Sequence, residues 1–203
     1  MCCQKGRLTV GVGVGWTLEE IVLLGGPPFA ERAQASEEYV QAVQDLFQQG
    51  LYAAFDKLLF APKSAQLPRA PMGWGRSRAR VGARVGGNGW YPVAANPRIP
   101  LETPQLYGDA LAEVRAEAER AFRDPGQILG AILAIYCRIG TEQQGREGGR
   151  LAFTGSVQAV VDDIGYFQER GLQHCVIGGD GKDLQGTLEL LRRFAAKVMA
   201  KCD

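Results

Sequence analysis

The run ILGAILAIYC, from Ile128 to Cys137, is almost wholly apolar and carries no charge. Such a run is typical of a strand that is buried on both faces, as in a parallel sheet covered by helices. Segments with helical periodicity stand on either side of it. The stretch therefore predicts an α/β protein built on a parallel sheet.

Three helices are expected around this strand, each with a start signal. Thr103 caps the first, with Pro104 at its first position, Ser156 caps the second, and Asp183 caps the third. The sequence Asp124-Pro125-Gly126 is expected to stop the first helix, and Gly171 the second. The expected apolar stripes are Tyr107, Leu111, Val114, Ala118 and Phe122 in the first helix, Val157, Val160, Val161, Ile164 and Phe167 in the second, and Leu184, Leu188, Leu191, Ala195 and Val198 in the third.

Towards the N-terminus, the run LTVGVGVGW (residues 8–16) predicts a buried strand. A helix is expected to begin at Ser36 and to end at Gly50, with Tyr39, Val40, Val43, Leu46 and Phe47 along one side. Residues 51–67 read as an extended excursion, and residues 75–85 have helical composition. Short strands are expected at 71–74, 90–93 and 174–177, and the polar segment 140–150 reads as a mobile loop.

These elements make five strand–helix alternations, and two architectures fit them. A doubly wound open sheet of five strands would be complete, whereas a (β/α)8 barrel would lack three units. The pattern of elements by itself favours the open sheet.

The overall composition excludes several classes of function. The chain has 203 residues and a formal net charge of +1, so it offers no basic surplus for a nucleic-acid backbone. We expect one domain over residues 1–203, with no membrane-spanning helix and no secretory signal. The five cysteines are an odd number without a C-x-x-C pair, which favours reduced thiols in the cytoplasm and no zinc site. Cys137 and Cys175 read as small core residues, and His174 is not expected to be catalytic.

Glycines gather where ligands would bind, beyond the carboxyl ends of the strands. Gly75, Arg76 and Ser77 follow a short strand and form a candidate phosphate cradle, because backbone N–H groups, a guanidinium and a hydroxyl all donate to an anion. The turn 178–181 is a second candidate. Gly11, Gly13 and Gly15 leave one face of the first strand bare, for a close-packed element or for a flat ligand. Three tryptophans, Trp16, Trp74 and Trp90, follow glycines near strands. Each of them, considered by itself, is expected to fill one end of the hydrophobic core.

The order of several short segments resembles the bacterial-luciferase-like flavin or deazaflavin oxidoreductases. The first strand looks like the fourth-strand region of that family, and the Gly75-Arg76-Ser77 turn looks like its phosphate loop. The segments that carry the resemblance are Arg7–Trp16, Pro28–Arg32, Phe60–Lys63, Gly87–Pro92, Gly155–Gly171 and Leu184–Leu188.

The resemblance implies a partial (β/α)8 barrel made of the family's units four to eight. It implies a cytoplasmic oxidoreductase or monooxygenase that uses FMN or the deazaflavin coenzyme on a small-molecule substrate. Gly75, Arg76 and Ser77 would hold the phosphate, with Gly13 and Trp16 near the ring, and no general acid or base carries over. The family's first three units are missing, so a second copy or a partner chain is expected to cover the open barrel edge, or the chain is inactive.

Two alternatives stay open. The same barrel remnant can serve as a non-catalytic flavin-binding or interaction protein. A five-stranded flavodoxin-like sheet would bind FMN through the loop after the first strand, but nothing in Thr17–Leu24 resembles a phosphate loop.

Overall fold

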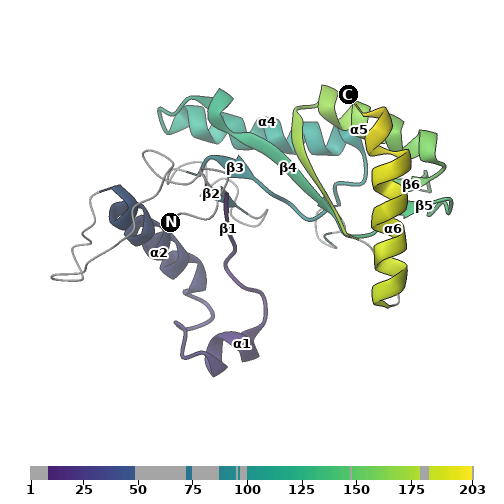
Figure 1. Ribbon diagram of the computed structural model, residues 1–203. Coiled ribbons are helices and arrows are strands. Elements are labelled where there is room, and N and C mark those ends of the chain that lie inside the picture. The colour runs from purple at the N-terminus through teal and green to yellow at the C-terminus, as the bar shows by residue number, and fades with distance from the viewer. Residues whose placement is uncertain are drawn as a thin grey trace.

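The computed structural model describes residues 9–48, 72–74, 87–94, 96, 100–146, 148–178 and 183–202. Its main feature is one parallel sheet of five strands (Figure 1). The strands are neighbours in chain order: β1 (Val10–Val12), β2 (Met72–Trp74), β3 (Gly89–Trp90), β4 (Leu129–Ala134) and β7 (Leu172–Ile177). The excursion expected at 51–67 and the helix expected at 75–85 lie outside the described residues.

The strand order decides between the two architectures. A doubly wound sheet starts in the middle and reverses direction, so that its strands are not in chain order. Here each strand pairs in parallel with the next one along the chain, and among the described residues β1 and β7 each have one partner. The structure is therefore an open arc of a barrel. The partial barrel is confirmed, and the preference for a doubly wound sheet is wrong because both folds share the same local pattern.

Among the described residues, four helices follow the predicted order, whereas the helix Leu18–Leu23 and two further short strands were not predicted. A second sheet of two short strands, β5 and β6, lies between β4 and α5 in the sequence. The bounds are α1 (Leu18–Leu23), α2 (Arg32–Gln48), α4 (Pro104–Arg120), η2 (Pro125–Gln127), β5 (Arg138–Ile139), β6 (Thr154–Gly155), α5 (Val157–Glu169), α6 (Leu184–Lys197) and η3 (Met199–Lys201). Among the described residues, no helix combines the length and the apolar character needed to cross a bilayer.

The core lies between the sheet and the helices α4 and α5. Alternate residues of β4 serve it, since Ile132 and Ala134 are fully buried against the helices. Four aromatic side chains fill the space in one connected row: Trp90 stacks on Tyr107 with ring centroids 5.3 Å apart, Tyr107 meets Phe167 at 5.4 Å, and Phe167 meets Phe153 at 4.9 Å. Burial of such rings supplies most of the hydrophobic stabilisation of this half.

The three predicted helix caps are confirmed. The Thr103 hydroxyl accepts from the Leu106 N–H at 3.2 Å, the Ser156 hydroxyl accepts from the Ala159 N–H at 3.1 Å, and the Asp183 carboxylate accepts from the Gly186 N–H at 2.7 Å. Each bond satisfies one donor that the first helical turn leaves without a partner, which is why these short polar residues start helices.

Two predicted boundaries are wrong. The helix expected to begin at Ser36 begins at Arg32, because the Ser36 hydroxyl bonds back to the Arg32 carbonyl at 2.7 Å inside the helix. The stripe expected to reach Phe122 stops earlier, since α4 ends at Arg120. Phe122 has φ 56° and is fully exposed, and the Arg123 N–H caps the helix on the Ala118 carbonyl at 2.9 Å.

The sequence pattern also predicted two strands that are longer than the observed ones. The expected strand over residues 8–16 has three residues, and the run from Ile128 to Cys137 is a strand only to Ala134, after which the chain turns and Arg138 starts β5. In α6 the predicted apolar stripe is mostly not buried, because of its five members only Val198 reaches the core. The core contacts of α6 are made by Leu190 and Phe194 instead.

Candidate functional site

The face of the sheet opposite the helices is hollow. Side chains of alternate strand residues line a cavity of about 300 Å³ there, at the small end of the range for ligand sites. All five strands of the sheet take part. Among the residues that line it are Gly11, Gly73, Gly89, Tyr91 and His174.

Three glycines form the floor of this cavity. Gly11 of β1 is in register with Gly73 of β2, which is in register with Gly89 of β3. A Cβ at Gly11 or at Gly13 would meet no described atom within 4 Å, and one at Gly73 would meet its nearest atoms only at 3.9 Å. No described element packs closely over Gly11 and Gly13, so the bare backbone has room for a flat ligand.

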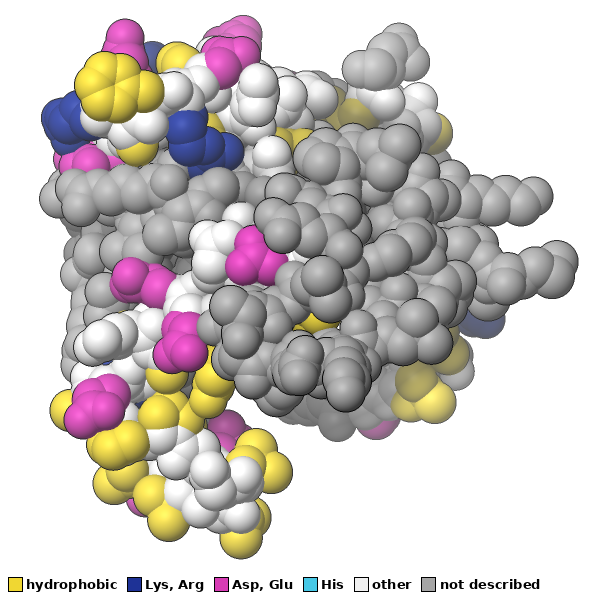
Figure 2. All heavy atoms as spheres, turned by 90° about the vertical axis from the view of Figure 1, so that its left-hand side faces the viewer, with side chains coloured by type: hydrophobic (Ala, Val, Ile, Leu, Met, Phe, Trp, Pro, Cys, Tyr) yellow, Lys and Arg dark blue, Asp and Glu magenta, His cyan; other side chains and the backbone are white. Residues whose placement is uncertain are grey.

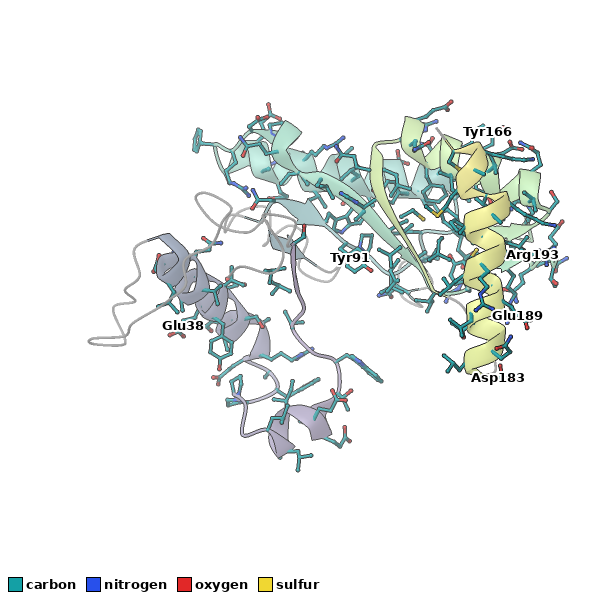
Figure 3. All side chains as sticks on the ribbon, viewed as in Figure 1. Glu38, Tyr91, Tyr166, Asp183, Glu189 and Arg193 are labelled. Carbon is teal, nitrogen blue, oxygen red and sulfur yellow. The ribbon has the colours of Figure 1, made fainter. Side chains whose placement is uncertain are left out.

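Polar groups stand around the glycine floor. Tyr91, directly after β3, lies on the side of the sheet away from α4 (Figure 3). Burial, followed by the effect of Cys175, raises the pKa of Tyr91, so its hydroxyl keeps its proton at neutral pH and can donate a hydrogen bond. His174 of β7 lines the same cavity, although the sequence analysis assigned it no role.

Of the sequence-predicted site residues, the structure describes Gly13 and Trp16, which follow the carboxyl end of β1. The strands β1 and β2 end side by side, because Val12 is in register with Trp74. Gly13 follows β1 and is exposed, and the Trp16 side chain is 87% exposed. The predicted phosphate residues Gly75, Arg76 and Ser77 lie outside the described residues, so their role stays a prediction.

Of the other glycine and tryptophan candidates, the two that follow are explained by packing. Trp90 is 1% exposed and faces the helices, so it is a core residue, as the sequence predicted for it. Of the turn 178–181 only Gly178 is described. Its N–H donates to the Ala134 carbonyl at 2.9 Å, and a Cβ there would come within 2.9 Å of Ile135, so close packing explains that glycine.

The cysteines behave as core residues, as predicted. Cys137 is fully buried and Cys175 packs against the same core. Burial raises the pKa of Cys137 to about 11 and that of Cys175 to about 12, so both thiols stay protonated and unreactive at neutral pH. In the described part of the chain, no three His, Cys, Asp or Glu side chains are grouped so as to hold a metal ion.

A buried ion pair was missed by the sequence analysis. Asp163 in α5 is 4% exposed and accepts two bonds from the Arg150 guanidinium, at 2.8 and 2.6 Å, and a third from the Phe153 N–H at 2.7 Å. The Arg150–Asp163 clasp ties the described part of segment 140–150, read as a loop, to α5. The signal was an aspartate next to Ile164 on an otherwise apolar helix face, since a carboxylate there needs a partner.

A protein-family model and several solved structures match this chain. Residues 2–174 match a family model described as luciferase-like monooxygenase. A search of curated protein sequences returned no significant match.

Among solved structures, the chain superposes on an F420-dependent secondary alcohol dehydrogenase, in complex with an F420-acetone adduct, with a TM-score of 0.65 at 17% identity, covering 95% of this chain and 70% of that chain. It also superposes on a monooxygenase from Streptomyces bottropensis with a TM-score of 0.66 at 18% identity, covering 97% of this chain and 69% of that one.

A third structure is a type II Baeyer-Villiger monooxygenase from Pseudomonas putida in complex with FMN, with a TM-score of 0.61 at 11% identity, covering 97% of this chain and 72% of that chain. At these identities the likeness establishes the fold alone, and activity has to be argued from the site.

Proposed function

This chain belongs to the luciferase-like monooxygenase family, and on that basis we propose that it binds a flavin-type cofactor, FMN or a deazaflavin coenzyme, for oxidation or reduction of a small organic substrate. The observation that carries the proposal is the row Gly11, Gly73 and Gly89, which offers bare backbone to a planar ring. The solved structures with this fold include one with an F420 adduct and one with FMN.

The chain's own residues would bind and orient such a group. The glycine floor would let a ring face approach the bare backbone, which larger side chains at these positions would prevent. The protonated Tyr91 hydroxyl donates to an acceptor at the ring edge or on the substrate. Gly75, Arg76 and Ser77 would supply donors for the phosphate, and Gly13 and Trp16 would lie near the ring. When bound, the cofactor supplies hydride transfer or oxygen activation, and the protein supplies position and shape.

Titration with FMN, riboflavin and coenzyme F420, followed by fluorescence, tests the proposal. The expected result is saturable binding of FMN or F420, weakened about tenfold or more by Gly11→Leu, because the new side chain occupies the floor. Gly165→Ala is the matched control, since a Cβ there meets no described atom within 4 Å and lies on α5, away from the cavity. No binding of either cofactor by the folded chain would overturn the proposal.

The phosphate residues are tested by the difference between FMN and riboflavin, which lacks the phosphate. Arg76→Ala should remove most of the preference for FMN and leave riboflavin binding unchanged. An equal loss for both ligands would mean that Arg76 does not meet the phosphate.

A second candidate is the non-catalytic flavin-binding protein. The observation that favours it is the open sheet, because a cavity open on one side excludes water poorly. Tight flavin binding without turnover when a reductant and O2 are added would select this alternative.

A further inference from the structure

We infer that Tyr91 and His174 together bind the oxygen atom of an uncharged, mainly apolar substrate, an alcohol or a carbonyl compound. The two residues are called the Tyr91–His174 pair below. The inference deepens the proposed function and rests on it, since the molecule held by the pair is the one that the cofactor would oxidise or reduce. It also gives a role to the one histidine of the chain.

The first observation is the strand register that brings both residues to one face of the sheet. Ala131 of β4 is in register with His174 of β7. On the other side of β4, Gly130 is in register with Trp90 of β3, and a later bridge keeps the same offset. Tyr91 therefore stands opposite Ala131. The two members of the pair and Ala131 form one row across three neighbouring strands.

The second observation is the small residue in the middle of this row. Ala131 carries only a methyl group, and all three residues line the cavity on the face away from the helices, where Figure 3 shows Tyr91. Neighbouring strands lie about 5 Å apart, so the backbones at Tyr91 and His174 are separated by about 10 Å. The two longer side chains therefore stand on either side of a space that one small group of a ligand can occupy.

The third observation is the hydrogen-bonding chemistry of the pair. The Tyr91 hydroxyl is protonated and donates, since burial raises its pKa. A neutral imidazole offers one nitrogen that donates and one that accepts. Within the part of the chain that the structure describes, no hydrogen bond to another residue occupies either side chain. A carbonyl oxygen between them can accept from both, and an alcohol oxygen can accept from Tyr91 and donate to His174.

The rest of the lining indicates that the ligand carries no charge. Besides the pair, the described residues around the cavity are glycines, aliphatic residues, Thr9 and Asn88, and none of them is an aspartate, glutamate, lysine or arginine. Cys175, next to His174 in the chain, packs into the core on the other face. An ionised ligand without a charged partner would lose its hydration at high cost. The lining therefore favours an uncharged alcohol or carbonyl compound.

The pair stands beside the glycine floor. Tyr91 comes two residues after Gly89 and faces the same side of the sheet, about 7 Å further along the strand direction. A substrate held by the pair would therefore lie next to a ring on the floor, and such proximity is what a reaction between the two requires.

The single histidine provides the readout of the test. The full chain, with 15N in its histidine ring, is titrated with cyclohexanol and with cyclohexanone, first without a cofactor and then with saturating FMN. Both probes should shift the His174 ring signals in nuclear magnetic resonance spectra, and the shift should saturate. Cyclohexanecarboxylate, which adds a charge to the same ring, should bind about tenfold more weakly or less.

This readout separates the cavity from other apolar surface. Figure 2 shows hydrophobic side chains gathered at the end of the molecule that carries α1, where Val22 and Leu23 are exposed. Neither residue lines the cavity. A probe that adsorbs to α1 therefore leaves the His174 signals unchanged.

Matched tyrosine variants test the hydroxyl. Tyr91→Phe removes only this group and should weaken the binding of cyclohexanone about fivefold or more. Tyr166→Phe is the control, because Tyr166 is exposed on α5, away from the cavity (Figure 3), and it should change nothing.

Histidine variants test the ring, with calorimetry as the readout. His174→Leu should weaken the binding of both probes about fivefold or more, and His174→Gln, which keeps a donor and an acceptor, should restore part of the loss. His174 is exposed, so these variants fold, which circular dichroism checks.

Unchanged His174 signals with both probes, equal binding of the carboxylate, or equal effects of the two tyrosine variants would overturn the inference. Flavin binding is measured separately. A chain that binds FMN but neither probe overturns this inference alone. A chain that binds the probes but no cofactor overturns the proposed function and supports the pair as a binding site for an oxygen.

Discussion

The two halves of the sheet are built to different degrees. Around β4, nineteen buried residues form one hydrophobic cluster with α4 and α5. Around β1, the part of the chain that the structure describes contributes Val40 as a buried residue, with Val10, Val12 and Val43 partly buried against it. Both halves use the same unit of strand and helix. A β/α unit is stabilised by packing with its neighbours, and within the described residues β4 pairs with a strand on each side whereas β1 pairs with β2.

The largest expected effect compares the two hydrophobic clusters directly. Phe167→Ala removes a fully buried ring that touches Tyr107 and Phe153, and should lower the free energy of unfolding by about 4 kcal/mol. Val40→Ala should cost about 1.5 kcal/mol, because it removes two carbons from a small cluster. Urea denaturation measures both values. A loss for Val40→Ala as large as that for Phe167→Ala, although valine loses fewer carbons, would contradict the looser packing expected around β1.

The next largest loss of stability is expected when the Arg150–Asp163 clasp is broken. Asp163→Ala leaves the Arg150 guanidinium and the Phe153 N–H without their partner, and should cost about 3 kcal/mol. Asp162→Ala is the matched control. The Asp162 carboxylate is exposed and accepts a bond from Gln158 on the helix surface. Its removal should change the free energy of unfolding by no more than about 0.5 kcal/mol. Thermal unfolding compares the variants. Similar melting temperatures for the two would refute the structural role of the clasp.

Replacing glycine with alanine at two positions distinguishes a closely packed glycine from one that has open space around it. A Cβ at Gly130 would lie 2.5 Å from the Gly171 carbonyl and 2.6 Å from the Tyr107 hydroxyl, so Gly130→Ala should destabilise by about 1–3 kcal/mol. Gly11→Ala meets no described atom and should leave stability within about 0.5 kcal/mol. A large loss from Gly11→Ala would mean that another segment already covers the glycine floor.

The smallest effect is a loss of stability at alkaline pH, confined to the packed half. The pKa of Cys175 rises from 9.0 to about 12 on burial and that of Cys137 to about 11. The folded chain therefore keeps protons that the unfolded chain loses above pH 9. This contribution is complete below pH 9 and is lost as the pH rises towards these folded values.

Melting temperatures between pH 8 and pH 10 check this against a variant without the two thiols, because tyrosines of the unfolded chain, with a pKa near 10, begin to titrate in the same window and affect both chains alike. The variant with Cys137→Ala and Cys175→Ala should show a flatter profile than the unaltered chain. An equally steep fall in the variant would assign the pH dependence to other groups.

Local signals predicted much of the packed half. Thr103, Ser156 and Asp183 start their helices because a short polar side chain reaches the first free N–H groups, an interaction that needs no distant partner. The helix ends were less predictable. Phe122 continues the apolar stripe of α4, yet the Arg123 N–H finds the Ala118 carbonyl and closes the helix first.

The candidate site was predicted in part. The alternation of glycines in β1 indicated a bare face, but their alignment with Gly73 and Gly89 depends on strand register, which no local pattern contains. The same register places Tyr91 and His174 in one cavity, and turns Trp90 to the opposite side.

The sequence by itself determined the alternating strands and helices and their caps, because each follows from periodicity and from contacts between residues close in the chain. The order of its short segments carried the resemblance to the family. Only the tertiary structure decided that the strands stand in chain order as an open arc, that three glycines meet across it, and that the leucines of α6 turn away from the core. These features depend on pairing between strands far apart in the chain, and the free energy of that pairing is set by burial and register.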